Sequence, residues 1–373
     1  MSRAQDKILN YKADLYEDDE IDGERVRKLT GNVKFVQGAY TLESDEGIFF
    51  LVSNRIVFEG NVRFYDGIKS LNADKVVYDN AKRIFYFDEG IELIRSGKVL
   101  RANRGIYYRD EGRSFCEGNV LFRDSVNTFK CDSAYFFEEN ENIKAFSNLI
   151  FDSADDEMTV TGEEGMYFSD RDFIEITDTP KLIIRGENSD VVITSERLDI
   201  SAKESAVTAR GNVEIVRDDL TARCAIANYV TEDDEVKIVL IENPIITEGS
   251  STIRGDSIEI FFKDKNISKL IAHKNAEATI GADSSSEYYN ELKGKTIFIY
   301  LQKDSAERMV AERNAESIYY LMEDGKIKGA NRATGEKITL LFSEGTIKRV
   351  LVDGESEGIF YPSHLLKLMP DEK

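Results

Sequence analysis

The sequence contains no tryptophan, two histidines, three cysteines and four prolines among its 373 residues. Neither His273 nor His364 stands beside a metal-ligand or catalytic-triad pattern, and two histidines cannot supply a site that recurs along the chain. Three cysteines are too few for a disulfide scaffold. No phosphate-binding glycine loop occurs. We therefore expect no metal, no other cofactor and no catalytic residue.

Positive charge and long apolar runs are also scarce. Lys and Arg number 49 against 70 Asp and Glu, and the net charge of −21 disfavours nucleic acid, whose binding depends on neutralised phosphates. No run approaches the roughly 18 apolar residues of a membrane-spanning helix. The N-terminal residues lack the apolar core of a secretory signal. Either the protein is cytoplasmic, or its leader peptide has been removed from the sequence.

A repeat with an asparagine anchor runs along most of the chain. Asn61 of a Gly-Asn-Val motif lies 29 residues after the equivalent Asn32, and Asn119 lies 58 residues after Asn61. Later spacings are about 31 to 32 residues. Further copies, complete or degenerate, stand at Gly90, Asn148, Pro180, Asn212, Asn243, Asn275 and Asn314. A self-similar period of roughly 20–50 residues is typical of stacked repeat architectures.

Each repeat has the pattern of a bent β-hairpin. Phe, Tyr, Val and Ile alternate with polar residues on both sides of the anchor, and short Gly, Asn and Asp turns separate the segments. Gly60 lies within one segment, where glycine often marks a bend. The apolar phase slips by one residue at Asp74 and Lys75, which indicates a bulge. We predict an all-β fold of bent antiparallel hairpins, with solvated acids at the bends.

The inward phase forms either a dry core or an open groove, and periodicity does not distinguish the two. A groove would be a site for apolar ligands. Its predicted lining is Val33, Phe35, Phe58, Val62, Phe64, Tyr78, Phe87, Ile91, Leu93, Tyr107, Val120, Phe122, Phe136, Leu149, Phe151, Val213, Ile215 and Tyr229.

The segments "LTGNVKF", "FEGNVRFYDGIKSLNADKVVYD" and "ARGNVEIVRDDLTARCAIANY" resemble the OstA-like (organic solvent tolerance) family, which includes LptA and the periplasmic domain of LptD. The resemblance implies an elongated β-taco or β-jellyroll solenoid of bent antiparallel strands, built from the repeats described above. It implies a non-enzymatic periplasmic bridge that carries lipopolysaccharide from the inner to the outer membrane. The acyl chains of lipid A would occupy the inner groove. A periplasmic member would carry a leader, and we expect that one was removed ahead of the first residue of this sequence. No barrel-forming pattern follows the repeats, which argues against a full outer-membrane translocon subunit.

The resemblance also implies partners and a location. The partners are lipopolysaccharide and other Lpt-type β-jellyroll proteins, LptC-like at the inner membrane and LptD-like at the outer membrane. Further copies of this chain are an additional option. Exposed edge strands template strand addition, and we expect end-to-end contacts through the strands near Tyr11–Leu15 and Ile338–Val352. The implied location is the periplasm, with association with the outer membrane left open.

Two other functions are compatible with the repeat. One is a structural or adhesive β-solenoid with a closed core, and the other is a carbohydrate-active solenoid enzyme, which needs only two carboxylates at a defined separation. Cys116 and Cys131 lie in the apolar phase of adjacent predicted strands, either bonded or as two free thiols. The predicted domains are a leading strand at 1–28, OstA-like repeats at 29–282, an irregular insertion with a strand at 283–303, further repeats or a cap at 304–361, and a tail at 362–373.

Overall fold

The protein is described by a computed structural model. The described residues are 10–65, 67, 69–95, 97–123, 128–152, 158–186, 189–201, 206–232, 235–264, 266–282, 288–302, 305–323, 326–343 and 345–369. They form two compact units, residues 1–178 and 179–373.

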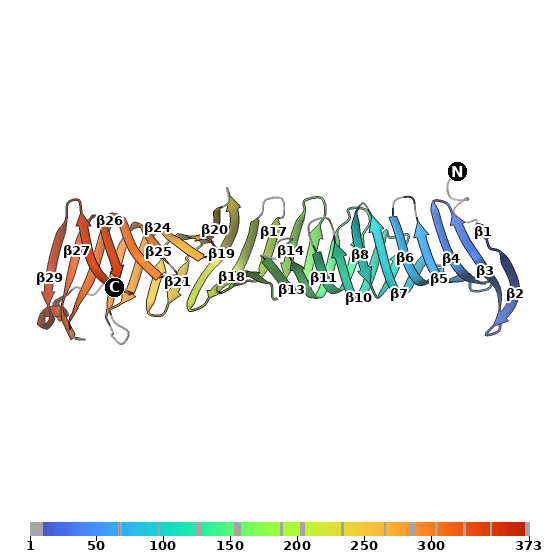
Figure 1. The fold of residues 1–373 in the computed structure, drawn as a ribbon, viewed down its shortest axis with the longest axis horizontal. Helices are drawn as coiled ribbons and strands as arrows, with labels where there is room; N and C mark the ends of the chain where they lie inside the picture. The colour runs from blue at the N-terminus through green and yellow to red at the C-terminus, as the bar shows by residue number, and fades with distance from the viewer. Residues whose placement is uncertain are drawn as a thin grey trace. The chain divides into compact units, whose positions relative to one another are not determined.

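The first unit consists of antiparallel strands joined by short turns. Each long strand pairs with its neighbours in the sequence, so that β5 lies between β4 and β6. Figure 1 shows these strands side by side in chain order. The strands are β1 (Asn10–Lys12), β2 (Leu15–Ile21), β3 (Glu24–Gln37), β4 (Tyr40–Phe50), β5 (Arg55–Tyr65), β6 (Lys69–Asp79), β7 (Ile84–Arg95), β8 (Lys98–Ala102), β9 (Arg104–Tyr108), β10 (Arg113–Arg123), β11 (Thr128–Phe137), β12 (Ile143–Asp152), β13 (Met158–Phe168) and β14 (Phe173–Thr177).

The second unit continues the same pattern with longer strands toward its end. For example, β26 pairs antiparallel with β25 and β27. Its elements are β15 (Lys181–Ile184), β16 (Val191–Thr194), β17 (Arg197–Ser201), β18 (Ala206–Arg217), β19 (Leu220–Glu232), β20 (Glu235–Ile241), β21 (Ile245–Glu248), β22 (Ser251–Arg254), β23 (Ser257–Lys263), β24 (Asn266–Gly281), β25 (Tyr289–Gln302), β26 (Ser305–Glu323), β27 (Lys326–Ser343), β28 (Thr346–Asp353), β29 (Glu357–Pro362) and the 3₁₀-helix η1 (Ser363–Leu368).

A β-bulge at the anchor bends the strands. In β5 the register with β6 shifts between Glu59 and Val62, which leaves Gly60 and Asn61 in left-handed conformation at φ +77° and +47°. Glycine and asparagine adopt this conformation most readily. The side-chain amide of Asn61 then donates a hydrogen bond to Asp45 Oδ2 at 2.7 Å.

The same bond recurs at several bends. Equivalent bonds join Asn32 to Asp14, Asn148 to Asp132, Asn212 to Glu196 and Asn275 to Asp256. The recurrent acids are exposed at the bends, as predicted, and they also accept hydrogen bonds from the anchor amides. These bonds are exposed, so each contributes at most about the 0.5–1.5 kcal/mol of an ordinary intramolecular hydrogen bond.

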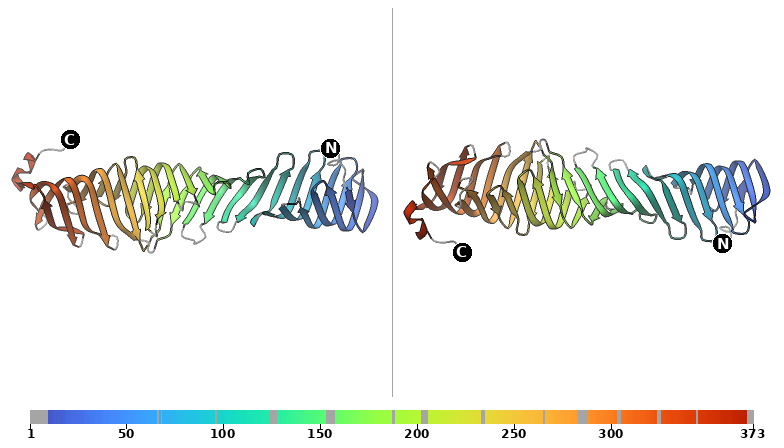
Figure 2. Two further views of the ribbon diagram at one scale, coloured as in Figure 1. Left: turned by 90° about the horizontal axis from the view of Figure 1, so that it is seen from above. Right: turned by 90° about the horizontal axis from the view of Figure 1, so that it is seen from below.

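Each bend divides a strand into two halves, and the halves face each other across the unit interior. The turns between strands form two rows. We call first-row turns those that follow the strand half after the anchor, as between β3 and β4, β7 and β8, or β18 and β19. Second-row turns lie at the opposite ends, as between β6 and β7, β11 and β12, or β27 and β28. Within each unit the turns follow two opposite borders (Figure 2). Contacts between first-row and second-row turns, such as that of Arg109 with Gln37, mark the side on which the two rows meet, and we call this side the mouth of the interior.

The structure confirms the all-β fold of bent antiparallel strands and the register slip at Asp74 and Lys75, which lies between Ala73 and Lys75. The predicted insertion at 283–303 contains β25, and its residues 283–287 lie outside the described part of the chain. Ile338 was expected on an end strand, but it lies in β27, which pairs on both sides with β26 and β28. The other predicted domain boundaries stay predictions.

The three cysteines are free thiols. Cys116 pairs with Ala134 and Cys131 pairs with Val120, because the bulge between Glu117 and Val120 offsets the two cysteines. A bond between Cys116 and Cys131 is therefore not formed. Among the described residues, no helix is long and apolar enough to cross a membrane, and no group of three or more His, Cys, Asp or Glu side chains is placed to hold a metal ion.

Candidate functional site

The interior of the first unit is packed with aromatic rings. Phe35 contacts Phe58 edge to face, with ring centroids 4.8 Å apart. Phe64 packs against Phe85 at 5.3 Å and against Tyr107 at 6.2 Å. Phe35 and Phe64 lie in the strand halves that follow an anchor, whereas their partners lie in the halves on the other side of a bend. The contacts therefore cross the interior. The cavities left beside these rings measure about 30 Å³ and about 10 Å³, room for one water molecule at most.

Side chains from both rows of turns also close the mouth of the first unit. Arg109, from a second-row turn, donates from Nη1 to Gln37 Oε1 at 2.5 Å, and its guanidinium lies 4.2 Å from the ring centroid of Tyr40. The Tyr78 hydroxyl donates to the same Gln37 oxygen at 3.3 Å. Burial raises the pKa of Tyr78, although Arg109 opposes the shift. We name these four residues the Arg109 clasp.

A second contact crosses the mouth farther along the unit. Glu141, in the second-row turn between β11 and β12, lies 3.2 Å from Arg95 Nε and 3.3 Å from Lys98 Nζ, both beside a first-row turn. Lys98 Nζ also donates to Ser169 Oγ at 2.8 Å. We name Arg95, Lys98, Glu141 and Ser169 the Glu141 clasp. Among the residues that the structure describes here, the two clasps and the packed rings close this interior.

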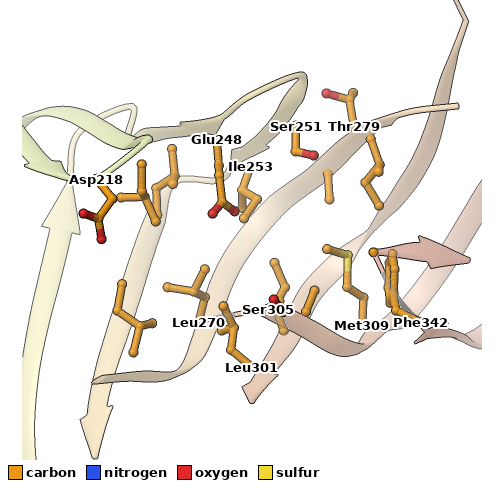
Figure 3. A pocket seen from close by; sticks show the side chains of 18 of the residues that line it. Asp218, Glu248, Ser251, Ile253, Leu270, Thr279, Leu301, Ser305, Met309 and Phe342 are labelled. Carbon is orange, nitrogen blue, oxygen red and sulfur yellow. The ribbon is translucent and has the colours of Figure 1, made fainter. Parts of the chain in front are cut away.

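The second unit, in contrast, contains a partly open cavity of about 270 Å³. Figure 3 shows its two walls, with Glu248 and Ile253 on one side of the space and Leu270, Leu301 and Met309 on the other. One wall comes from the halves that end in first-row turns and the other from the halves that end in second-row turns. The apolar lining consists of Leu220, Ile246, Ile253, Ile267, Leu270, Ala278, Ile280, Ile299, Leu301, Ala306, Met309 and Phe342.

Polar groups gather at the rim of this cavity, where Asp218, Glu248, Ser251, Thr279 and Ser305 lie. At one end, buried Arg217 donates from Nη2 to Asn266 Oδ1 at 3.2 Å, a contact between a first-row and a second-row turn. At the other end the Tyr319 hydroxyl lies 3.5 Å from the Ile347 carbonyl oxygen. The mouth of the second unit is thus bridged at two places, with the cavity between them. An apolar interior and a polar rim are what ligand sites commonly combine.

Side-chain size explains why the cavity lies in the second unit. Among the described residues, twelve Phe and Tyr side chains are buried in the first unit, and one, Tyr229, is buried in the second. The second unit fills its interior with Ile, Leu, Val and Ala on the same bent strands. Ala278 and Ala306 stand at the cavity, where larger side chains would reach across it. Backbone geometry is shared, and the side chains decide whether the interior is filled.

All 18 residues predicted to line a groove are buried, so the inward phase was identified correctly. None of them lines the cavity of the second unit. Fifteen lie in the first unit, several of them in the packed aromatic core, and Val213, Ile215 and Tyr229 lie elsewhere in the second. A role of these residues in lipid binding stays a prediction. Sequence reasoning missed the cavity residues because it followed the aromatic repeats, and the change from aromatic to aliphatic residues was the signal that could have located them.

Comparison with known families identifies part of the chain. Residues 108–204 match the family model described as OstA-like protein. The chain carries an OstA-like domain. This confirms the predicted family from the end of β9 to the residues before β18, a narrower range than the repeats themselves. No curated protein matches the chain.

One solved structure that matches this chain is the crystal structure of LptH from Pseudomonas aeruginosa. Its title describes LptH as the LptA-homologous periplasmic component of the conserved lipopolysaccharide transport device. The sequences are 14% identical, and the match covers 46% of this chain and 95% of that chain with a TM-score of 0.27. A likeness of this strength supports no inference about function.

Proposed function

We propose that this OstA-like protein is a non-enzymatic lipid carrier that holds an acyl chain in the cavity of the second unit. The observation that carries the proposal is a cavity between two walls of bent strands whose lining is mainly apolar, with polar side chains such as Asp218, Glu248 and Ser305 among it. Each methylene removed from water contributes about 0.8 kcal/mol. An acyl chain of about a dozen methylenes would then gain on the order of 10 kcal/mol before ordering costs.

The size of the cavity limits what it accepts. At about 270 Å³ it is slightly smaller than the roughly 300–1,000 Å³ typical of small-molecule pockets. We infer that one acyl chain enters at a time, while the rest of a multi-chain lipid stays at the mouth. The polar rim is suited to the part of the lipid that remains hydrated.

We propose lipopolysaccharide as the cargo, the periplasm as the location, and transfer from the inner to the outer membrane as the direction. The OstA-like domain supports this choice. In this proposal the predicted inner-face residues of the first unit, such as Phe64 and Phe122, also contact acyl chains. They become accessible when the clasps open.

End-to-end partners would add to the edge strands. In the first unit β2 pairs with β3, and Leu15 and Tyr16 on it are exposed. In the second unit β28 and β29 pair with β27, and Ile359 and Phe360 are exposed. We propose that LptC-like and LptD-like proteins, or further copies of this chain, pair with these end strands.

Site-directed photo-crosslinking tests the cargo. A photo-reactive residue at Ile253 or Met309 is expected to capture lipopolysaccharide, and one at the exposed outer positions Arg63 or Arg123 is not. Ala278→Phe fills the cavity and should lower capture at Met309 at least about tenfold, the effect of losing 1.4 kcal/mol. Equal capture at the inner and outer positions, or capture unaffected by Ala278→Phe, would reject the cavity as the lipid site.

A second candidate function rests on the first unit. Its interior is packed and its mouth is closed by the two clasps, as expected of a structural β-solenoid with a dry core. If no position in either unit captures lipid, this structural role is the better description of the whole chain.

A further inference from the structure

The bends of β24, β25 and β26 differ from the other bends in the charge they carry. The residue before the anchor asparagine is glycine at positions 31, 60, 118 and 211. In β24 and β26 it is Lys274 and Arg313, and both keep the left-handed conformation, at φ +53° and +66°. A left-handed residue with a Cβ costs roughly 1–2 kcal/mol. Ser147 and Glu242 precede the anchors Asn148 and Asn243 and are left-handed as well, at φ +60° and +65°. The bends of β24 and β26 are therefore distinguished by the cation they carry at this position, rather than by strain.

The acid that normally receives the anchor amide is also replaced by a cation. Asp256 lies 19 residues before Asn275 and accepts its side-chain hydrogen bond at 3.0 Å. The residue 19 positions before Asn314 is Lys295, which cannot accept such a bond. The repeat thus loses a stabilising contact at this bend and gains a positive charge.

The three cations lie on neighbouring strands. The register of β24 with β25 shifts between His273 and Ala276, and that of β25 with β26 shifts between Lys293 and Thr296. Lys274, Lys295 and Arg313 fall within these adjacent bulges, on strands about 4.8 Å apart, and all three are exposed. Like charges side by side on a sheet are destabilising. Strain, a lost hydrogen bond and charge repulsion therefore coincide at one place.

The cations surround a hollow on the outer side of the bends. It measures about 620 Å³, and its lining includes all three. Its two carboxylates are engaged with other groups, since Asp256 accepts from Asn275 and Glu277 lies 3.6 Å from Lys293. Among the described residues, Lys274, Lys295 and Arg313 form no ion pair. This hollow is separate from the cavity, whose lining on β24 lies in the two halves that flank the bend.

We propose that this hollow binds a phosphate-type anion through Lys274, Lys295 and Arg313. The bound anion offsets the repulsion between the three cations and accepts charge-assisted hydrogen bonds from them. In a chain with a net charge of −21, an anion has few other places to bind. The chemistry is shared by a free phosphate or pyrophosphate and by the phosphate of a lipid headgroup. The site does not depend on the carrier function proposed above.

The repeat itself supplies the decisive variant. Lys274→Gly, Lys295→Asp and Arg313→Gly together restore the pattern of the earlier bends. The folded state should be at least as stable as the wild type, because the strain and repulsion are removed, so a loss of binding would not reflect unfolding. A milder pair, Lys295→Gln with Arg313→Gln, keeps the backbone residue types closer to the wild type. The control is Lys348→Gln with Arg349→Gln, two exposed cations on β28.

Binding is measured by calorimetry with pyrophosphate and by co-sedimentation with vesicles of phosphatidylglycerol, against phosphatidylcholine. Both binding-site variants should weaken binding at least about tenfold, the effect of losing one hydrogen bond to a charged group, and the control should not. Pyrophosphate binding identifies a soluble ligand, and binding to anionic vesicles alone identifies a membrane-borne phosphate. No binding in either assay, or an equal loss in the control, would overturn the proposal.

Discussion

The two units use the same bent hairpin and differ in what fills it. In the first unit, aromatic side chains from opposite halves interlock, and the Arg109 and Glu141 clasps close the mouth. In the second unit, aliphatic side chains leave a cavity of about 270 Å³, and the bridges at Arg217 and Tyr319 stand at its ends. The phase of apolar residues along the strands is the same in both. Whether such a sheet is a core or a container therefore depends on side-chain volume and on contacts across the mouth.

Truncating one interior residue in each unit should give the largest difference between them. Phe64→Ala removes a fully buried ring in a packed core and should destabilise the first unit by about 3–5 kcal/mol. Leu270→Ala removes a side chain that already borders a cavity, and its cost should fall near the lower end of the roughly 2–5 kcal/mol range. Amide hydrogen exchange measures each unit separately, since a chain of two units need not unfold in one step. Equal losses would contradict the difference in packing.

Exchanging glycine at the bends should act in opposite directions in the two units. In the first, Gly60→Ala places a Cβ 2.6 Å from Asp45 Oδ2 at a φ of +77°. The left-handed conformation costs roughly 1–2 kcal/mol, and displacing Asp45 weakens its bond to Asn61 by about 1 kcal/mol more. In the second, Lys274→Gly should stabilise. Thermal unfolding of both variants checks the signs, and a destabilised Lys274→Gly variant would show that its side chain contributes more than the strain costs.

The sequence was sufficient for the strands, the bends and the inward phase, because these depend on a short repeat. The glycine of the Gly-Asn anchor predicts a bend, and alternation assigns Phe58, Val62 and Phe64 to the interior. The cavity could not be predicted in the same way. Its walls come from residues far apart in the sequence, such as Leu220 and Phe342, and an empty volume depends on the sum of their sizes. The two clasps could not be predicted from the sequence either, because Arg109 and Gln37 come into contact only when the strands are bent.

Two cysteines at equivalent positions allow a chemical comparison of the units. Cys131 pairs with Val120 and Cys224 with Val213, each after an anchor bulge. Burial raises the pKa of Cys131 to about 12 and that of Cys224 to about 11, from an ordinary value of 9.0. At pH 9 the thiolate fraction, and with it the rate of alkylation by iodoacetamide, should be about tenfold higher for Cys224. Mass spectrometry of the alkylated peptides measures both rates in one sample.

The same shifts predict a dependence of stability on pH. A pKa raised in the folded state means that folding holds the proton on the thiol, so this contribution is complete below pH 9 and is lost as the pH rises toward 11 and 12. Cys116, whose pKa burial also raises to about 12, should react as slowly as Cys131. Similar rates for all three thiols in the folded protein, as expected after unfolding, would contradict the tighter packing of the first unit.

Breaking the Glu141 clasp should change the stability of the first unit least, but it should change the access of lipid to its interior. Glu141→Gln weakens the pairs with Arg95 and Lys98, and partly exposed ion pairs contribute about 0–1 kcal/mol. Because the pairs cross the mouth, their loss should raise lipid capture by a photo-crosslinker at Phe122 up to about fivefold. Glu59→Gln is the matched control, since it breaks the pair between Lys75 and Glu59 on adjacent strands without touching the mouth. If Glu141→Gln and Glu59→Gln behave alike, the clasp does not control access. The aromatic packing alone would then close the interior of the first unit, and only the second unit would bind lipid.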